Sequence, residues 1–92
     1  MAAVVGGSLD ELSQLKQVLD NQATAVQSVN DTIESQVNNT TWTGGNADRF
    51  RQAWSEFKPT LVKLRDTLTE TSEDIRKQHN ALAAATGDSA SI

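Results

Sequence analysis

Apolar residues recur at helical spacing along the first part of the chain. An apolar residue at every third or fourth position forms a single stripe on a helix. Ser8 and Glu11 match the capping box, in which each side chain accepts a bond from the other residue's backbone N–H. We therefore predict a helix over about 8–38. Its stripe contains Leu12, Leu15, Leu19, Val26, Val29 and Ile33.

Two polar residues, Gln22 and Gln36, occupy positions that continue the spacing of this stripe. If they lie at the edge of the stripe, water solvates them. If they face another helix, they bond across the interface and fix its register, as buried polar residues do in coiled coils. The pattern leaves both interpretations open.

A second and stronger stripe runs from Phe50 to Leu82 and is interrupted only by Thr71 and Gln78. We predict a helix over about 47–85, roughly 55 Å long at 1.5 Å per residue. Pro59 falls opposite the stripe, where water can satisfy the carbonyl that loses its backbone bond, so we expect a bend rather than a break. The stripe contains Phe50, Trp54, Phe57, Leu61, Leu64, Leu68, Ile75 and Leu82.

The segment between the two stripes, about 39–46, is rich in Asn, Thr and Gly, which favour turns and caps over helix interiors. Gly44 and Gly45 readily supply the positive φ that a chain reversal needs. Trp42 precedes them as a large apolar residue that can pack back onto the helices. Asn46 or a neighbour is expected to cap the second helix.

These elements predict one all-α helical-hairpin domain over residues 1–92, with a frayed arm over 1–7 and a flexible tail over 86–92. Two helices side by side bury little surface, because each has only one neighbour. The second stripe is long enough to need a partner of equal length. We therefore expect this hairpin to pair with another chain or with a second copy of itself.

The net charge of −4 argues against nucleic acid, whose phosphates require a concentrated basic surface. No apolar run approaches the roughly 20 residues that a membrane-spanning helix needs, so we expect a soluble protein without stable membrane insertion. The chain start lacks the features of a secretory signal peptide, so we expect any export to use another signal. The first helix is acidic and the second mixed, which suits antiparallel pairing within the hairpin or between copies, although solvated surface charge also explains it.

Little in the sequence is suited to catalysis. His79 is the only histidine, and cysteine and tyrosine are absent. Four-helix di-metal sites need carboxylates that point into the core, whereas the inward positions here are Leu and Ile. We place His79 at the rim of the second stripe. We expect no enzyme activity, no catalytic residue, no metal site and no cofactor.

The central Trp42-Thr43-Gly44, between two amphipathic helices and followed by Phe50 and Trp54, resembles the WXG family. These are the ESAT-like (early secretory antigenic target) proteins of type VII secretion systems. The resemblance implies a helix-turn-helix hairpin that pairs antiparallel with a second copy or a paralogue into an elongated four-helix bundle dimer. It also implies recognition by a membrane-associated ATPase of the FtsK/SpoIIIE type, and secretion from the cytoplasm without a cleaved signal peptide. The family motif carries onto Trp42 and Gly44 only.

The chain departs from the family pattern in one respect. Exported members, or one partner of each pair, usually carry Tyr-x-x-x-Asp/Glu after the second helix, and this chain has no tyrosine. One interpretation is a secreted substrate or co-secreted partner, and the alternative is an intracellular adaptor or chaperone partner that is exported only as the passenger of another WXG protein. Homodimer and heterodimer both stay open. Trp42 either forms with a partner's helix end the surface that the ATPase recognises, or only braces the glycine turn.

Overall fold

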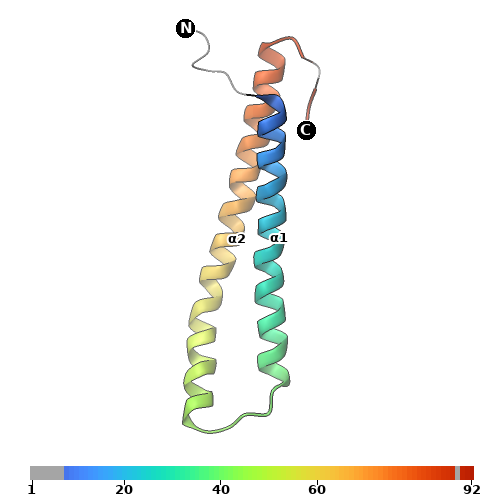
Figure 1. Ribbon diagram of the computed structural model, residues 1–92. Helices are drawn as coiled ribbons and strands as arrows, with labels where there is room; N and C mark the ends of the chain where they lie inside the picture. The colour runs from blue at the N-terminus through green and yellow to red at the C-terminus, as the bar shows by residue number, and fades with distance from the viewer. Residues whose placement is uncertain (1–7, 89) are drawn as a thin grey trace.

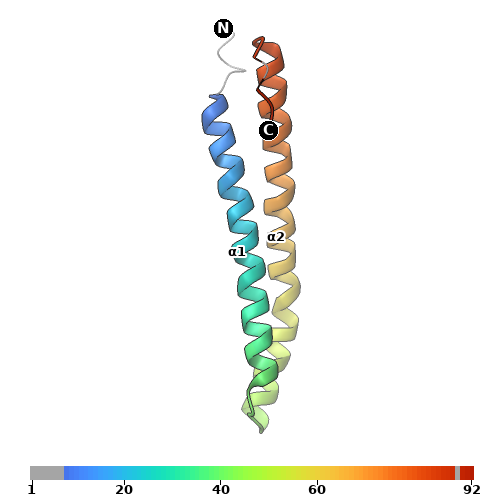
Figure 2. The ribbon, with the colours of Figure 1, turned by 90° about the vertical axis from the view of Figure 1, so that its right-hand side faces the viewer.

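The protein folds into two long antiparallel helices that lie side by side. The computed structural model describes residues 8–88 and 90–92, so the arm expected over 1–7 lies outside the described residues. Helix α1 runs from Leu9 to Asn39 and helix α2 from Gly45 to Ala85. The helices cross at a shallow angle. They overlap near the chain termini in the view of Figure 1 and near the turn in the perpendicular view of Figure 2. The predicted all-α hairpin is confirmed.

The start of α1 contains one of the two bonds of the predicted capping box. Ser8 is the N-cap residue, and its Oγ accepts a hydrogen bond of 3.2 Å from the backbone N–H of Glu11. Asp10 and Glu11 place negative charge in the first turn, where it interacts favourably with the helix dipole. The helix ends before Thr40, whose extended backbone begins the turn.

The chain reverses at Gly44 rather than at both glycines of the pair. Gly44 is the N-cap residue of α2 and has a φ of 109°, a backbone conformation that residues other than glycine rarely adopt. Its carbonyl accepts a bond of 3.0 Å from the N–H of Asp48. Gly45 is already helical, so α2 begins two residues before the predicted start. Asn46 does not cap the helix, because Gly44 is the N-cap residue and Asn46 already lies in the first turn, where its side chain accepts a bond from Arg49.

Helix α2 passes through Pro59 without a break, and Pro59 is exposed to solvent as its position opposite the stripe predicts. The helix ends in a Schellman motif. Gly87, with a φ of 76°, donates its N–H to Ala84, and the N–H of Asp88 donates to the carbonyl of Ala83 at 2.8 Å. The flexibility expected of the tail beyond this point stays a prediction.

The hairpin is a thin body with a small interior. Its principal extents are 64 × 21 × 13 Å. Among the described residues, none of the larger side chains is fully buried. Three of the four buried apolar residues are alanines, whose small side chains let the helices approach. The buried apolar residues are Ala23, Ala47, Trp54 and Ala83, and the buried polar ones are Ser72 and His79.

Candidate protein–protein interface

One apolar stripe of each helix faces the other helix of the hairpin. We call these residues the inner stripe. On α2, Trp54 is buried, and the other members on both helices are partly buried. They form the packing that holds the hairpin together. The inner stripe consists of Leu12, Leu19, Val26, Ile33, Trp54, Leu61, Leu68 and Ile75.

A second set of large apolar side chains points away from the hairpin contact, and we call it the outer stripe. On α2, Phe50, Phe57 and Leu64 follow at sevens and are 45, 50 and 46% exposed. The sequence placed these three in one stripe with Trp54 and Leu61, as core or dimer-interface residues, and the single hairpin leaves them about half exposed. The outer stripe consists of Leu15, Val29, Phe50, Phe57 and Leu64.

Both helices contribute the outer stripe to the same side of the hairpin. Leu15 and Val29 are spaced by fourteen residues, and Gln36 continues their line by another seven. Gln36 lines a pocket together with Phe50 of α2. The row of residues on α1 that includes Leu15 and the row on α2 that includes Phe50 therefore run along the same broad side of the hairpin. Gln22 and Gln36 on this side are both exposed in the hairpin.

The turn places Trp42 next to the outer stripe. Trp42 is 43% exposed, and its ring lies 6.0 Å from that of Phe50, centroid to centroid, in a tilted arrangement. An Nη2 of Arg51 donates to the backbone carbonyl of Trp42 at 2.7 Å and ties the turn to α2. Spacing along the chain does not indicate this role for Arg51, because the role depends on the path of the loop. Trp42 thus extends the apolar side to the end of the hairpin.

An open apolar pocket lies between the helices at this end, and we call it the turn-end pocket. Its volume is about 340 Å³. Trp42 and Phe50 form one wall, and Ile33 and Val37 of α1 form the other. A pocket with apolar walls and few polar groups suits an apolar side chain. Its lining residues are Thr32, Ile33, Gln36, Val37, Thr40, Trp42, Phe50 and Arg51.

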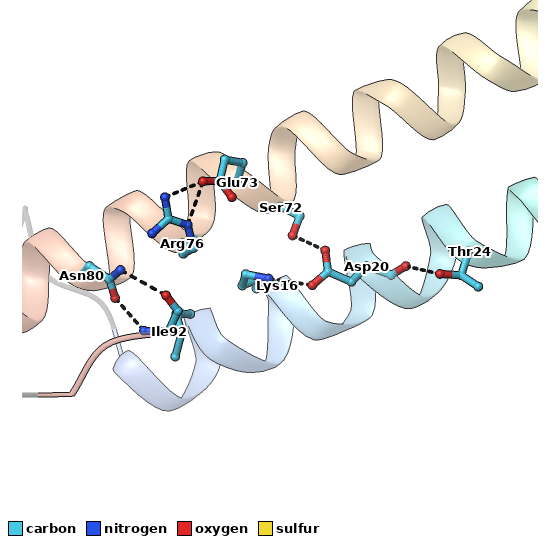
Figure 3. A network of polar contacts seen from close by, with 8 residues as sticks. All are labelled: Lys16, Asp20, Thr24, Ser72, Glu73, Arg76, Asn80 and Ile92. Atoms are coloured by element: carbon cyan, nitrogen blue, oxygen red, sulfur yellow. Dashed lines mark hydrogen bonds and ion pairs between the residues drawn. The ribbon is translucent and has the colours of Figure 1, made fainter.

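Polar pairs join the helices in regular register, and we call them the polar ladder. Their positions fall every seven residues on each helix, so each rung lies two turns from the next. Lys58 Nζ lies 3.1 Å from a carboxylate oxygen of Glu34, and the other two rungs are hydrogen bonds. Figure 3 shows the rung nearest the chain termini, where the Ser72 hydroxyl donates to Asp20. The rungs are Asp20–Ser72, Gln27–Arg65 and Glu34–Lys58.

Hydrogen bonds at two rungs stabilise the charged carboxylates. The pKa of Glu34 is lowered, first because the indole N–H of Trp54 donates to it at 2.7 Å, and then because Lys58 does. The pKa of Asp20 is lowered mainly by Lys16, whose Nζ lies 2.7 Å away, and next by Ser72. Both carboxylates are therefore more stable in the folded hairpin when they are ionised.

His79 is buried, at 3% exposure, so its predicted place at the rim of the stripe is wrong. It lies seven residues after the buried Ser72, on the line of α2 that faces α1. Its Nδ1 lies 3.0 Å from Oδ1 of Asn80. The apolar residues alone predict a centre for the contact between α1 and α2 that lies too far to one side of α2. The polar positions 58, 65, 72 and 79 mark a line of contact that the spacing of apolar residues does not reveal.

Two other kinds of site are absent from the part of the chain that the structure describes. Within residues 8–88 and 90–92, no group of three or more His, Cys, Asp or Glu side chains is placed to hold a metal ion. Neither helix within that range has the length and apolar character needed to cross a membrane.

The comparisons with known proteins give one informative result. The family model WXG100, described as proteins of 100 residues with WXG, matches residues 7–86. This range includes both helices and the turn with Trp42 and Gly44. No significant match was found among curated proteins or among solved structures.

Proposed function

The chain belongs to the WXG100 family, and from this premise we propose that it is a small non-enzymatic protein exported by a type VII secretion system. In this role it is a substrate or a co-secreted partner, and it dimerises through the outer stripe into an elongated four-helix bundle. A secretion ATPase of the FtsK/SpoIIIE type recognises the dimer in the cytoplasm before export.

One observation carries this proposal: the hairpin has almost no interior of its own, and it exposes an apolar side to solvent. Phe50, Phe57 and Leu64 are each close to half exposed, while the buried apolar residues within the described chain are mostly alanines. Contiguous exposed apolar surface marks interaction sites. Covering this side with two further helices gives each of these residues a packed environment. This exposed side supports a four-helix core to which the hairpin contributes two helices.

Dimerisation through this side is tested by two charge substitutions on α2. Phe57→Glu places a charge in the outer stripe, and Val62→Glu places one at an exposed apolar residue outside it. We expect light scattering to show loss of the dimer for Phe57→Glu only, while circular dichroism shows both variants to be helical. A Phe57→Glu variant that dimerised as tightly as the Val62→Glu control would contradict the proposal.

Recognition by the ATPase is tested at Trp42. Its ring is partly exposed at the end of the body, next to Phe50. We expect Trp42→Ala to keep the dimer helical and to reduce ATPase binding and export. Unchanged export would show that Trp42 only braces the turn, and the dimerisation proposal would stand.

The absence of tyrosine favours a second candidate, in which the chain is an intracellular adaptor or chaperone partner that leaves the cell only as a passenger. In that case the export signal lies on another WXG protein with which it heterodimerises. Expression in a secreting strain without any other protein of this family separates the two roles. Export of the chain alone supports the substrate role, and retention until a partner is supplied supports the passenger role.

A further inference from the structure

We propose that residues 90–92, which we call the strap, close the end of the hairpin opposite the turn, and that Asn80 holds the strap by binding the backbone of Ile92. We call this end, where α1 begins and α2 finishes, the open end. The strap clamps the start of α1 to α2 and can release it. It is a property of the single hairpin, so it does not depend on the proposed export function.

The chain turns back toward the hairpin directly after α2. Gly87 has a φ of 76°, and the N–H of Asp88 donates to the carbonyl of Ala83 at 2.8 Å. The carboxylate of Asp88 in turn accepts a bond of 2.8 Å from the N–H of Ala90. The residues that follow run back beside the helices, as Figure 1 shows at the end of the chain. The strap therefore lies beside the helix that the chain has just left.

The side-chain amide of Asn80 binds both backbone groups of Ile92 (Figure 3). Its Oδ1 accepts a bond of 2.9 Å from the Ile92 N–H, and its Nδ2 donates to the Ile92 carbonyl at 3.3 Å. A primary amide offers an acceptor and two donors, so it can pair with the donor and the acceptor of one residue. Asn80 therefore recognises the backbone of the strap and not a particular side chain.

His79 holds the amide of Asn80 in the orientation that the strap needs. Its Nδ1 lies 3.0 Å from the same Oδ1 that accepts the Ile92 N–H. Because this oxygen only accepts hydrogen bonds, the ring nitrogen bonded to it must carry a proton. His79 is 3% exposed and therefore has little freedom to move. Two donors from different parts of the chain thus fix one oxygen of Asn80.

Ile92 also reaches the start of α1. An open pocket of about 480 Å³ lies at the open end, and residues from both helices and from the strap line it. Figure 3 shows Ile92 between Asn80 of α2 and the first turn of α1. Ile92 is 38% exposed, so more than half of its surface is covered. The strap therefore bridges the two helices. The lining residues are Ser8, Leu9, Asp10, Ser13, His79, Asp88, Ala90 and Ile92.

The start of α1 is the part of the helix that most needs such a clamp. Helix ends fray, and local opening concentrates where few contacts hold the chain. The first backbone bond of α1 runs from the N–H of Leu12 to the carbonyl of Ser8, at 2.9 Å. The nearest rung of the polar ladder, Asp20–Ser72, lies roughly 16 Å along the helix from Leu9 at 1.5 Å per residue. The strap supplies a polar tie in the stretch before that rung.

The strap lies away from the outer stripe. Gln78 continues the row of α2 that contains Phe50, Phe57 and Leu64. Asn80 is two residues further along, about 200° around the helix, so it is on the opposite side of α2 from that row. A partner that covers the outer stripe therefore leaves Asn80 and the strap in place. Docking of the strap and dimerisation are separate events.

Hydrogen exchange of backbone amides, followed by NMR in the 92-residue chain, tests the strap. Two variants remove bonds between Asn80 and Ile92. Asn80→Ala removes the side-chain amide, and Ile92→Pro removes the backbone N–H. Ile92→Ala is the control for the second variant, because it shortens the side chain and keeps the backbone bonds. Gln78→Ala is the control for the first, because Gln78 is an exposed residue of the same helix outside the strap contact.

We expect the Ile92 amide to exchange more slowly than an unprotected amide, and Asn80→Ala to raise its exchange rate about fivefold, as the loss of one neutral hydrogen bond predicts. We also expect Asn80→Ala and Ile92→Pro to raise the exchange rate of the Leu12 amide about threefold or more, although neither residue belongs to α1. Ile92→Ala should raise that rate less than Ile92→Pro does. Gln78→Ala should leave both rates unchanged.

Three results would overturn parts of the proposal. Unprotected exchange of the Ile92 amide in the unchanged chain would show a free tail and no strap. A protected Ile92 amide, with a Leu12 rate that does not respond to Asn80→Ala, would show that the strap docks without clamping α1. Equal responses to Ile92→Pro and Ile92→Ala would show that the side chain of Ile92, and not its backbone, holds the strap.

Discussion

The indole of Trp54 donates a hydrogen bond of 2.7 Å to the carboxylate of Glu34, across the contact between the two helices. Trp54 is buried, and Glu34 also pairs with Lys58 of the polar ladder. The Trp54 side chain therefore packs within the inner stripe and also holds Glu34 of the Glu34–Lys58 rung in place. Because the bond joins residues twenty positions apart, it holds the two helices in a defined register near the turn.

The first prediction concerns Trp54→Phe, which keeps an aromatic ring and removes its N–H. Glu34 loses the main cause of its lowered pKa, so that pKa should rise toward the ordinary value of 4.5. An NMR titration of the Glu34 side chain measures the change, and Trp42→Phe is the control because Trp42 lies in the turn. If the Glu34 pKa moved equally in both variants, the Trp54 bond would not be its cause.

The second prediction concerns pH. Folding lowers the pKa values of Asp20 and Glu34 from their ordinary 3.8 and 4.5. The stability they contribute is present above the ordinary values and is lost as the pH falls through the lowered ones. The melting temperature should therefore decrease as the pH is lowered from about 4.5. Asp20→Asn with Glu34→Gln should give a flatter profile, and an equally steep one would assign the loss to other groups.

The third prediction separates the two glycines of the turn. Gly44→Ala forces a side chain into a backbone with a φ of 109°, which should cost about 1–3 kcal/mol. Gly45→Ala adds the same methyl group in the first turn of a helix, with nothing within 4 Å of the new atom, and should be neutral or stabilise by about 0.5–1 kcal/mol. Chemical denaturation measures both. Equal effects would contradict the assignment of the reversal to Gly44.

The fourth prediction concerns Asn30, whose Oδ1 is buried without a hydrogen-bond partner in the described chain. Asn30→Ala removes that oxygen and should raise the free energy of unfolding by about 1 kcal/mol. Asn21→Ala on the exposed surface of α1 gains helix propensity alone, so it is the matched control. The Asn30 variant should exceed the Asn21 variant in thermal stability. A smaller gain would mean that the oxygen is hydrogen-bonded to water in solution.

Much of the fold follows from local chemistry that the sequence displays. The N-cap residue Ser8 sets the start of α1, and the spacing of apolar residues predicts both helices to within two residues of their observed bounds. Gly44 marks the reversal because few other residues adopt its backbone conformation. Pro59 is accommodated because it faces water. These features depend on neighbours along the chain, and therefore one sequence is enough to predict them.

Only the tertiary structure decided which side of each stripe faces the other helix. The sequence placed Phe57 and Leu61 in one stripe of core or dimer-interface residues, and the hairpin partly buries Leu61 and leaves Phe57 half exposed. It also placed His79 at a rim, and the structure buries it. The reason is that a small rotation of each helix about its own axis changes which residues face the other helix. That rotation is set by the packing of small residues such as Ala23 and by pairs such as Gln27 with Arg65. Those contacts join residues far apart in the chain, so spacing alone does not reveal them.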